Sequence, residues 1–159
     1  YLGLAEDAPL RLPDNLYLWA TMNSADQGVF PMDTAFKRRW NYEYCGIDDA
    51  KDALLSVGYC AADWNKLRSH VNKLLQHAGV NEDKQMGPFF LSAVELETVD
   101  SFLSAVKSKV LMYLYEDAAR HKRAAVFKKS KARYSELCSF NSCEVDEIIE
   151  ELFLEITEG

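Results

Sequence analysis

The sequence predicts an α+β fold that is mostly α, with a strand-containing corner over residues 1–46 and a helical region over residues 47–159. Residues 16–22 are almost continuously apolar, which is typical of a strand buried on both faces of a parallel sheet. After Gly46, apolar residues recur at helical spacing. The chain is 48% hydrophobic over 159 residues, so it can bury a core, and this composition excludes a disordered or collagen-like chain.

The first predicted strand, residues 16–22, follows a turn signal at residues 12–15 (Leu-Pro-Asp-Asn). A second strand is predicted at residues 40–45, where aromatic and polar residues alternate. Between the two, Asp33 is placed to cap a short helix that runs to the second strand. A buried parallel strand needs neighbours on both sides and the sequence supplies at most one, so we expect the missing strands to precede Tyr1.

The region after Gly46 predicts four helices from their apolar stripes. One ends near residue 58, and the others lie at residues 64–78, 99–114 and 145–156. Asp48 or Asp49 can cap the first helix, and Gly79 is a natural stop for the second. Asn141 and Glu144 have the spacing of a capping box at the start of the last helix.

The charge of the chain is unevenly distributed. The formal net charge of -7 argues against a dedicated nucleic-acid-binding module, which usually carries a basic balance. Residues 120–133 nevertheless hold seven basic residues and no acid, and residues 134–159 hold eight acids and no base. The basic segment can contact DNA phosphates or an acidic partner, form a solvated helix end and loop, or pair with the acidic helix at residues 144–158.

Cysteine usage and hydropathy indicate a cytoplasmic protein. Four scattered cysteines do not form a disulfide scaffold, so we expect a reducing compartment. No apolar run reaches the roughly 18 residues of a membrane span, so we expect no membrane partner. Cys138 and Cys143 lack the usual spacing of zinc ligands, and His70 and His77 lie two turns apart on one predicted helix, where they can share a face. We expect no metal site.

The densest polar cluster, residues 21–26 (Thr-Met-Asn-Ser-Ala-Asp), directly follows the predicted buried strand. Ligands of open parallel sheets bind just beyond the carboxyl ends of the strands. Asn23 sits at such an end, where its amide can orient a water molecule or contact a phosphate oxygen. The alternative is an ordinary turn, which favours the same residue types.

Three consecutive bases, Lys37, Arg38 and Arg39, follow on the short predicted helix. An arginine held at a domain edge can reach the phosphates of a nucleotide on a neighbouring subunit and neutralise charge that develops during phosphoryl transfer. The alternative is a solvated helix end, where the helix dipole favours bases.

Residues 13–26 and 32–40 together closely resemble the McrB family, the AAA+ motor subunits of methylation-dependent restriction systems. The family pattern is a strand that ends in Thr-Met-Asn-Thr/Ala-Ala-Asp, followed by Asp-x-Ala-Leu-Arg-Arg-Arg-Phe. This sequence has Thr-Met-Asn-Ser-Ala-Asp and then Asp-Thr-Ala-Phe-Lys-Arg-Arg-Trp. Lys37 replaces the first arginine of the family run, and Gln27 stands where many members have Arg.

Residues 85–91 (Gln-Met-Gly-Pro-Phe-Phe-Leu) are similar to a short motif in the lid of some McrB-like proteins. The alternative is a loop that enters a strand or helix with Phe89 and Phe90 in the core.

The resemblance implies a role for each matching residue. Asn23 corresponds to the sensor-1 residue, which positions the attacking water near the γ-phosphate. Arg38 and Arg39 include the arginine finger, which acts in trans across a subunit interface. Asp26 and Asp33 match family positions and have supporting roles in orienting the sensor loop and the finger helix.

The resemblance also implies that residues 1–46 are the truncated C-terminal part of an AAA+ α/β core and that residues 47–159 are a helical lid. The parent would be a homo-oligomeric ring, hexameric as in the family, that hydrolyses GTP or ATP with Mg²⁺, drives a McrC-type nuclease and meets DNA indirectly. No P-loop and no strand ending in paired acids occurs in the sequence, so we expect the fragment alone to be inactive and to hold no cofactor. The alternatives are a non-catalytic helical interaction module and an AAA+ remodelling ATPase outside restriction.

Overall fold

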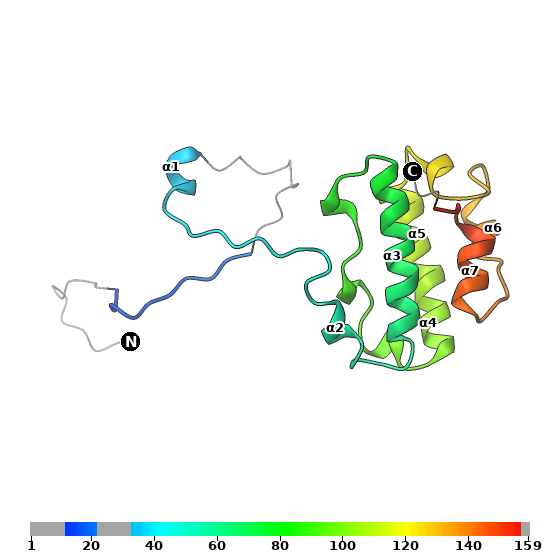
Figure 1. Cartoon of the computed structure of the whole chain (residues 1–159), viewed down its shortest axis with the longest axis horizontal. Helices are drawn as coiled ribbons and strands as arrows, with labels where there is room; N and C mark the ends of the chain where they lie inside the picture. Colours follow the sequence, from blue (N-terminus) through cyan, green and yellow to red (C-terminus); the bar gives the residue numbers. More distant parts are fainter. Residues whose placement is uncertain (1–11, 22–32, 157–159) are drawn as a thin grey trace, which may run out of the picture. The chain divides into compact units, whose positions relative to one another are not determined.

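The computed structural model describes residues 12–21 and 33–156, and the chain divides into two units, residues 1–31 and 32–159 (Figure 1). The α-helices are α1 (Thr34–Lys37), α2 (Lys51–Leu54), α3 (Ala61–His77), α4 (Val99–Ala105), α5 (Leu111–Tyr113), α6 (Tyr134–Leu137) and α7 (Val145–Leu152). Short 3-10 helices are η1 (Glu82–Lys84), η2 (Pro88–Phe90), η3 (Val94–Leu96) and η6 (Arg123–Ala125), and the segments η4 (Val106–Val110) and η5 (Leu114–Ala118) are π-helical. The prediction of a mostly α fold is confirmed.

The two predicted strands are not formed in the described part of the chain. Residues 16–21 are extended and exposed after a turn in which the Leu16 N–H donates to the Pro13 carbonyl at 3.1 Å, and Trp19 is 90% exposed. Residues 40–45 are also irregular and mostly exposed. A strand needs the backbone of a neighbour to pair with, and no such neighbour lies among the described residues. These two strand predictions are therefore wrong for the described residues.

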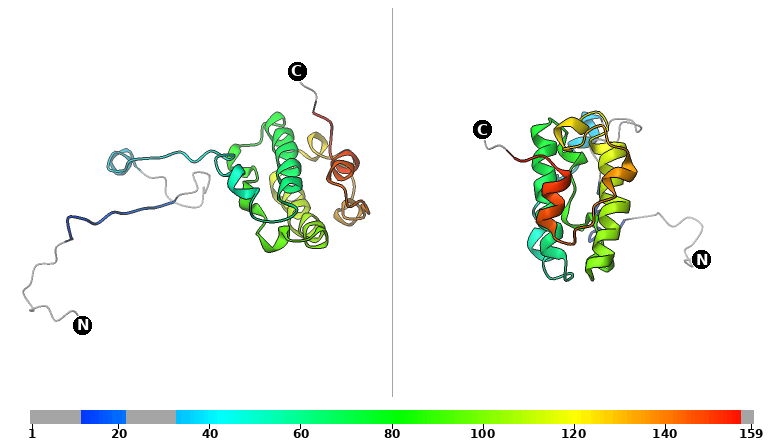
Figure 2. Two further views of the ribbon diagram at one scale, coloured as in Figure 1. Left: turned by 60° about the horizontal axis from the view of Figure 1, so that its bottom comes forward. Right: turned by 90° about the vertical axis from the view of Figure 1, so that its right-hand side faces the viewer.

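Of the predicted helices after Gly46, those at residues 64–78 and 99–114 are confirmed, whereas α2 ends at Leu54 and α7 at Leu152, short of their predicted ends near residues 58 and 156. Helix α3 ends at His77 with Ala78 as its C-cap, and Gly79 takes the left-handed conformation with φ of 67° that stops a helix. The predicted helix at residues 99–114 continues through residue 118 as the run α4–η4–α5–η5. Helix α7 packs against α3, as Figure 2 shows, and both contribute to one hydrophobic core.

The predicted caps of two helices are wrong. Helix α2 begins after Ala50 without a side-chain cap, because the Asp49 carboxylate accepts from the Gly46 N–H at 2.6 Å and Asp48 binds elsewhere. Helix α7 begins after Glu144, also without a side-chain cap. There the backbone N–H of Glu144 donates to the Ser142 hydroxyl at 3.0 Å, so the capping box with Asn141 does not form.

One face of α3 holds the loop that contains the Gly-Pro-aromatic motif. Trp64, Arg68 and Asn72 are four residues apart and therefore lie one above the other on the helix. The Trp64 Nε1–H donates to the Pro88 carbonyl at 2.7 Å, and the Arg68 Nη1 donates to the Met86 carbonyl at 3.2 Å. The Asn72 amide donates to the Met86 carbonyl and accepts from the Met86 N–H, both at 2.9 Å. We call these three side chains the α3 ladder.

The aromatic residues of this motif differ in burial. Phe90 is partly buried, with its ring 6.2 Å from Trp64 and 5.2 Å from Tyr113, centroid to centroid. Phe89 is 55% exposed, so its predicted place in the core is wrong. The ladder fixes the backbone at Met86 and Pro88, and this turn directs only one of the two rings inward.

A second set of contacts joins the α6 region to the long helix. The Tyr134 hydroxyl donates to the Lys107 carbonyl, and the Cys138 thiol lies 3.8 Å from the same oxygen. The Lys107 Nζ donates to the Phe140 carbonyl at 3.1 Å and lies 4.4 Å from the centroid of the Phe140 ring. Burial, reinforced by Cys138, raises the pKa of Tyr134 to about 12.

Replacing Asn72 with Ala tests the α3 ladder. The change removes both hydrogen bonds and leaves the buried Met86 N–H without its partner. We expect the free energy of unfolding, measured with urea, to fall by about 1–3 kcal/mol. Lys73→Ala on the exposed side of α3 is the control and should change it by less than about 0.5 kcal/mol. Equal small effects of the two variants would contradict the ladder.

The raised pKa of Tyr134 predicts a pH dependence of stability. The unfolded chain ionises this tyrosine near pH 10, whereas the folded chain keeps it neutral up to about 12. The stabilisation is therefore complete below pH 10 and is lost as the pH rises from 10 through 12. We expect Tyr134→Phe to reduce this loss in urea titrations, whereas Tyr59→Phe, at a residue that is 81% exposed, should retain the wild-type pH dependence. An unchanged slope in Tyr134→Phe would show that this hydroxyl does not carry the effect.

Candidate functional site

The predicted site residues are only partly within the described chain. Asn23 and Asp26 lie outside the described residues, so their roles stay predictions. Asp33, Arg38 and Arg39 lie in or beside α1 and can be placed.

Asp33 forms the N-cap of α1, as its position in the sequence predicts. Its carboxylate accepts from the Phe36 N–H at 2.6 Å, and its carbonyl accepts from the Lys37 N–H at 3.1 Å. The helix is only Thr34–Lys37, because the next amides turn back with the tighter spacing of a 3-10 helix. Phe36 and Trp40 then lie on the same side, with ring centroids 5.8 Å apart. Asp33 and this aromatic pair thus shape the segment that carries the bases.

The three bases of this segment are exposed and differ in their contacts. The Arg39 Nη1 donates to the Ala35 carbonyl at 2.8 Å, so this guanidinium folds back onto its own helix. Among the described residues, the Arg38 side chain has no hydrogen bond or ion pair. An exposed guanidinium presents a planar set of N–H donors that matches phosphate oxygens. Arg38 can therefore reach outward at no cost in existing contacts, whereas Arg39 must first release Ala35.

The segment that follows α1 is tied to the helical region through Asp48. The Glu82 carboxylate raises the pKa of the Tyr44 hydroxyl in this segment. The Asp48 carboxylate lies 2.6 Å from Nη2 of Arg68, which also contacts Asn65 Oδ1 at 2.6 Å. Arg68 is 1% exposed, so a buried guanidinium of the α3 ladder holds the start of the helical region through Asp48.

A polar hollow of about 470 Å³ lies between this tied segment and α3. Its lining combines Ile47 and Asp48 of the segment with Asn72 and Gln76 of α3 and Gln85 of the following loop. Arg68 and Asn72, which organise its walls, were missed in the sequence because polar residues within a helix usually indicate a solvated face. The sequence held one signal for them, which is their four-residue spacing from Trp64. This spacing places all three side chains on one helix face, where they can donate to the carbonyls of the loop that contains Pro88.

The residues considered for metal binding do not form a site. Among the described residues, no group of three His, Cys, Asp or Glu side chains is arranged to hold a metal ion. His70 is partly buried, and its Nε2 lies 2.9 Å from the Leu154 carbonyl oxygen. Burial lowers the pKa of this imidazole, although the Leu154 hydrogen bond opposes the shift. In the same part of the chain, no helix has both the length and the apolar character needed to cross a membrane.

Replacing Asp33 with Ala should unwind α1. A helix of four residues is marginal by itself, and the carboxylate cap contributes about 1 kcal/mol. We expect the backbone chemical shifts of residues 34–37 to move toward random-coil values in Asp33→Ala, whereas Asp33→Asn should retain most of the helical shifts. Helical shifts that persist in Asp33→Ala would show that the cap does not determine this helix.

The chain is similar to the Type II restriction enzyme BsuMI component YdiS of Bacillus subtilis (strain 168). The two are 44% identical over 124 residues, which is 73% of this chain and 35% of the relative. The chain thus spans about a third of the length of this curated relative. No family model and no solved structure matches the chain.

Proposed function

We propose that this chain is the sensor, finger and lid portion of a McrB-like AAA+ GTPase, or less favourably ATPase, that powers DNA restriction. The observation that carries the proposal is the similarity, over 73% of this chain, to a protein named as a component of the restriction enzyme BsuMI. The motif over residues 13–40 also supports the proposal, because it joins the polar cluster at residues 21–26 to a short basic helix.

The exposed apolar segment at residues 16–21 supports a place in a sheet of the longer protein. Leu18 is 70% exposed and Trp19 is 90% exposed, which is unfavourable for side chains of this size in water. In the proposed motor, neighbouring strands of the nucleotide-binding sheet pair with this segment and cover both faces. Asn23 would then follow the strand at the sheet edge and orient the attacking water.

The finger role fits the contacts of the two arginines. The nucleotide supplies the phosphoryl group and Mg²⁺ its counter-charge, and the exposed donors of Arg38 are of the type that binds phosphate oxygens. Arg38 would contact the nucleotide of a neighbouring subunit, while Arg39 braces α1 through the Ala35 carbonyl. Asp33 keeps this helix formed, and Asp26 would support the sensor loop. The sequence contains no P-loop, so other residues of the protein must hold most of the nucleotide.

The assembly that follows from this proposal is a cytoplasmic ring, hexameric as in the family, which acts with a McrC-type nuclease. The finger of one subunit completes the site of the next, so a single subunit has no complete site. The helical region forms the lid, and the contact of its Arg68 with Asp48 connects lid position to the segment that carries the finger.

A phosphate-release assay tests the proposal. We expect no turnover of GTP or ATP by the 159-residue chain alone. In the longer protein, Arg38→Ala should lower the rate by about 10³-fold or more and leave nucleotide binding intact, because a finger acts on the transition state. Lys37→Ala, at a base next to the finger, is the matched control and should retain most of the rate.

Two outcomes would contradict the proposal. Turnover by the pure chain would exclude the fragment assignment. Unchanged hydrolysis in both Arg38→Ala and Arg39→Ala would exclude the finger and would favour a non-catalytic helical interaction module.

A further inference from the structure

The structure divides the basic segment, residues 120–133, into two groups of side chains. Three of its cations hold the fold together by binding backbone carbonyls. The Lys122 Nζ donates to the Ala78 and Gly79 carbonyls at 2.6 and 2.9 Å, at the end of α3. The Arg123 Nη2 donates to the Tyr115 carbonyl at 2.8 Å, and the Lys128 Nζ donates to the Glu150 carbonyl at 2.6 Å.

The other four cations are exposed and unpaired within the described chain. They are Arg120, Lys129, Lys131 and Arg133. The predicted charge pairing with the acidic helix is wrong for the described residues, because no side-chain ion pair joins the two, and the basic segment reaches α7 only through backbone carbonyls. Asp146 lies 2.6 Å from Lys66 Nζ, and Glu147 lies 2.6 Å from the Ser142 hydroxyl.

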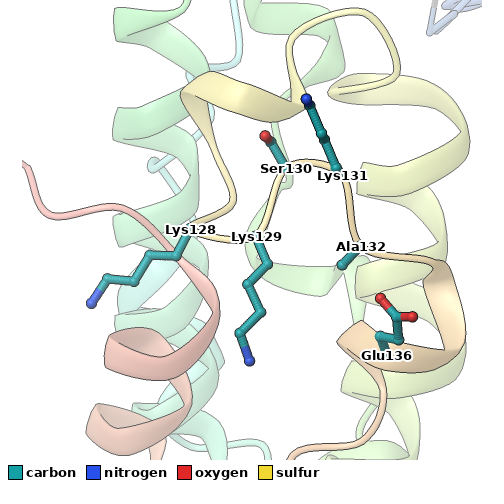
Figure 3. Close-up of a pocket in the computed structure, with 6 residues that line it drawn as sticks. All are labelled: Lys128, Lys129, Ser130, Lys131, Ala132 and Glu136. Carbon is teal, nitrogen blue, oxygen red and sulfur yellow. The ribbon is translucent and has the colours of Figure 1, made fainter.

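Three of these free cations belong to one turn, residues 128–133, which we call the basic turn. Its backbone is fixed by the Lys128 N–H, which donates to the Leu152 carbonyl at 3.0 Å, and by the Ala132 N–H, which donates to the Lys129 carbonyl at 3.0 Å. The turn surrounds a shallow hollow of about 450 Å³, lined also by Ser130 and Glu136 (Figure 3). The three cations of the basic turn thus project from a backbone that hydrogen bonds hold in place.

The side chains of the basic turn do not converge on one point. Figure 3 shows Lys128, Lys129 and Lys131 extending in different directions from the turn. Glu136, whose carboxylate accepts from the Arg133 N–H at 3.0 Å, also faces this hollow. A single small anion is bound by donors that converge, whereas an extended polyanion meets separated cations. The arrangement therefore favours a polymer of phosphates.

The surroundings of the basic turn favour duplex nucleic acid over protein as its partner. No large hydrophobic side chain is exposed among the described residues 113–156. Protein interfaces have an apolar, aromatic-rich centre and are depleted in Lys, and single-stranded nucleic acid is bound by exposed aromatic side chains that stack on bases. Small residues, Ser130 and Ala132, separate the cations and leave room for a phosphate backbone.

We propose that the basic turn binds the phosphate backbone of duplex DNA without sequence specificity. The choice of DNA rests on the proposed function in restriction. The proposal goes beyond that function because it assigns a DNA contact to the lid itself. The acidic face of the neighbouring α7 confines this contact to a few phosphates, which reconciles it with the net charge of -7. With about three phosphates neutralised, the logarithm of affinity should fall with the logarithm of salt concentration at a slope of about -3.

Fluorescence anisotropy of a labelled 20-base-pair duplex with the 159-residue chain at low salt tests this proposal. The variant is Lys129→Glu/Lys131→Glu. The matched control, Lys51→Glu/Lys73→Glu, changes the net charge equally at exposed residues of α2 and α3. We expect the turn variant to lose at least about tenfold in affinity and to reduce the salt slope by about 2, whereas the control should lose about twofold or less. Unfolding in urea checks that both variants fold.

Three results would overturn the proposal. They are no binding by the wild-type chain, equal losses in the two variants, and competition by poly-L-glutamate as effective per charge as competition by unlabelled duplex. The last result would assign the turn to an acidic protein. The anisotropy assay does not depend on nucleotide hydrolysis. DNA binding by the chain together with no turnover by the longer protein would therefore support this inference and contradict the proposed motor function. Turnover without DNA binding would discard this inference alone.

Discussion

The helical region depends on the α3 ladder, in which three side chains of one helix satisfy the backbone of the loop at Met86 and Pro88. Arg68 is the central member, because its buried guanidinium joins this loop to Asp48 and thereby to the segment that precedes the region. A buried charge is tolerated when it is paired and hydrogen-bonded. Arg68 is paired with Asp48 and also donates to the Met86 carbonyl and to Asn65 of its own helix, which leaves only its Nε without a partner. Helix α3 also receives Lys122 at its C-terminal carbonyls. Helix α3 thus contacts the segment that contains Asp48, the loop at Met86 and Pro88, and the start of the basic segment.

Helix positions could be predicted from the sequence because apolar periodicity reports burial directly. The end of α3 was predicted correctly from Gly79, where only a residue that accepts positive φ fits easily. The capping box of α7 was predicted wrongly, because Ser142 accepts from the Glu144 N–H that the box needed. The strand at residues 16–22 was predicted from its composition, but a strand is a property of at least two segments. The π-helical character of residues 106–110 and 114–118 has no signal in the periodicity.

The candidate site could be predicted only where one residue acts locally. The capping of α1 by Asp33 involves atoms three residues apart, and the sequence predicted it. The difference between Arg38 and Arg39 depends on which direction each side chain takes from a helix end, and the sequence pattern treats the two alike. Likewise, seven bases in one run appear equivalent until their partners, which are 8 to 44 residues away, are known. Asn23 and Asp26 stay predictions.

The central claim is that an arginine of this segment completes the nucleotide site of a neighbouring subunit. It is tested most directly by mixing two inactive forms of the longer protein, one with Arg38→Ala/Arg39→Ala and one with its P-loop lysine changed to Ala. Phosphate release by the mixture is the measurement, with sedimentation to verify that mixed assemblies form. We expect the mixture to recover hydrolysis, because an intact finger then meets an intact P-loop at some interfaces. Mixed assemblies that release no phosphate would contradict the claim.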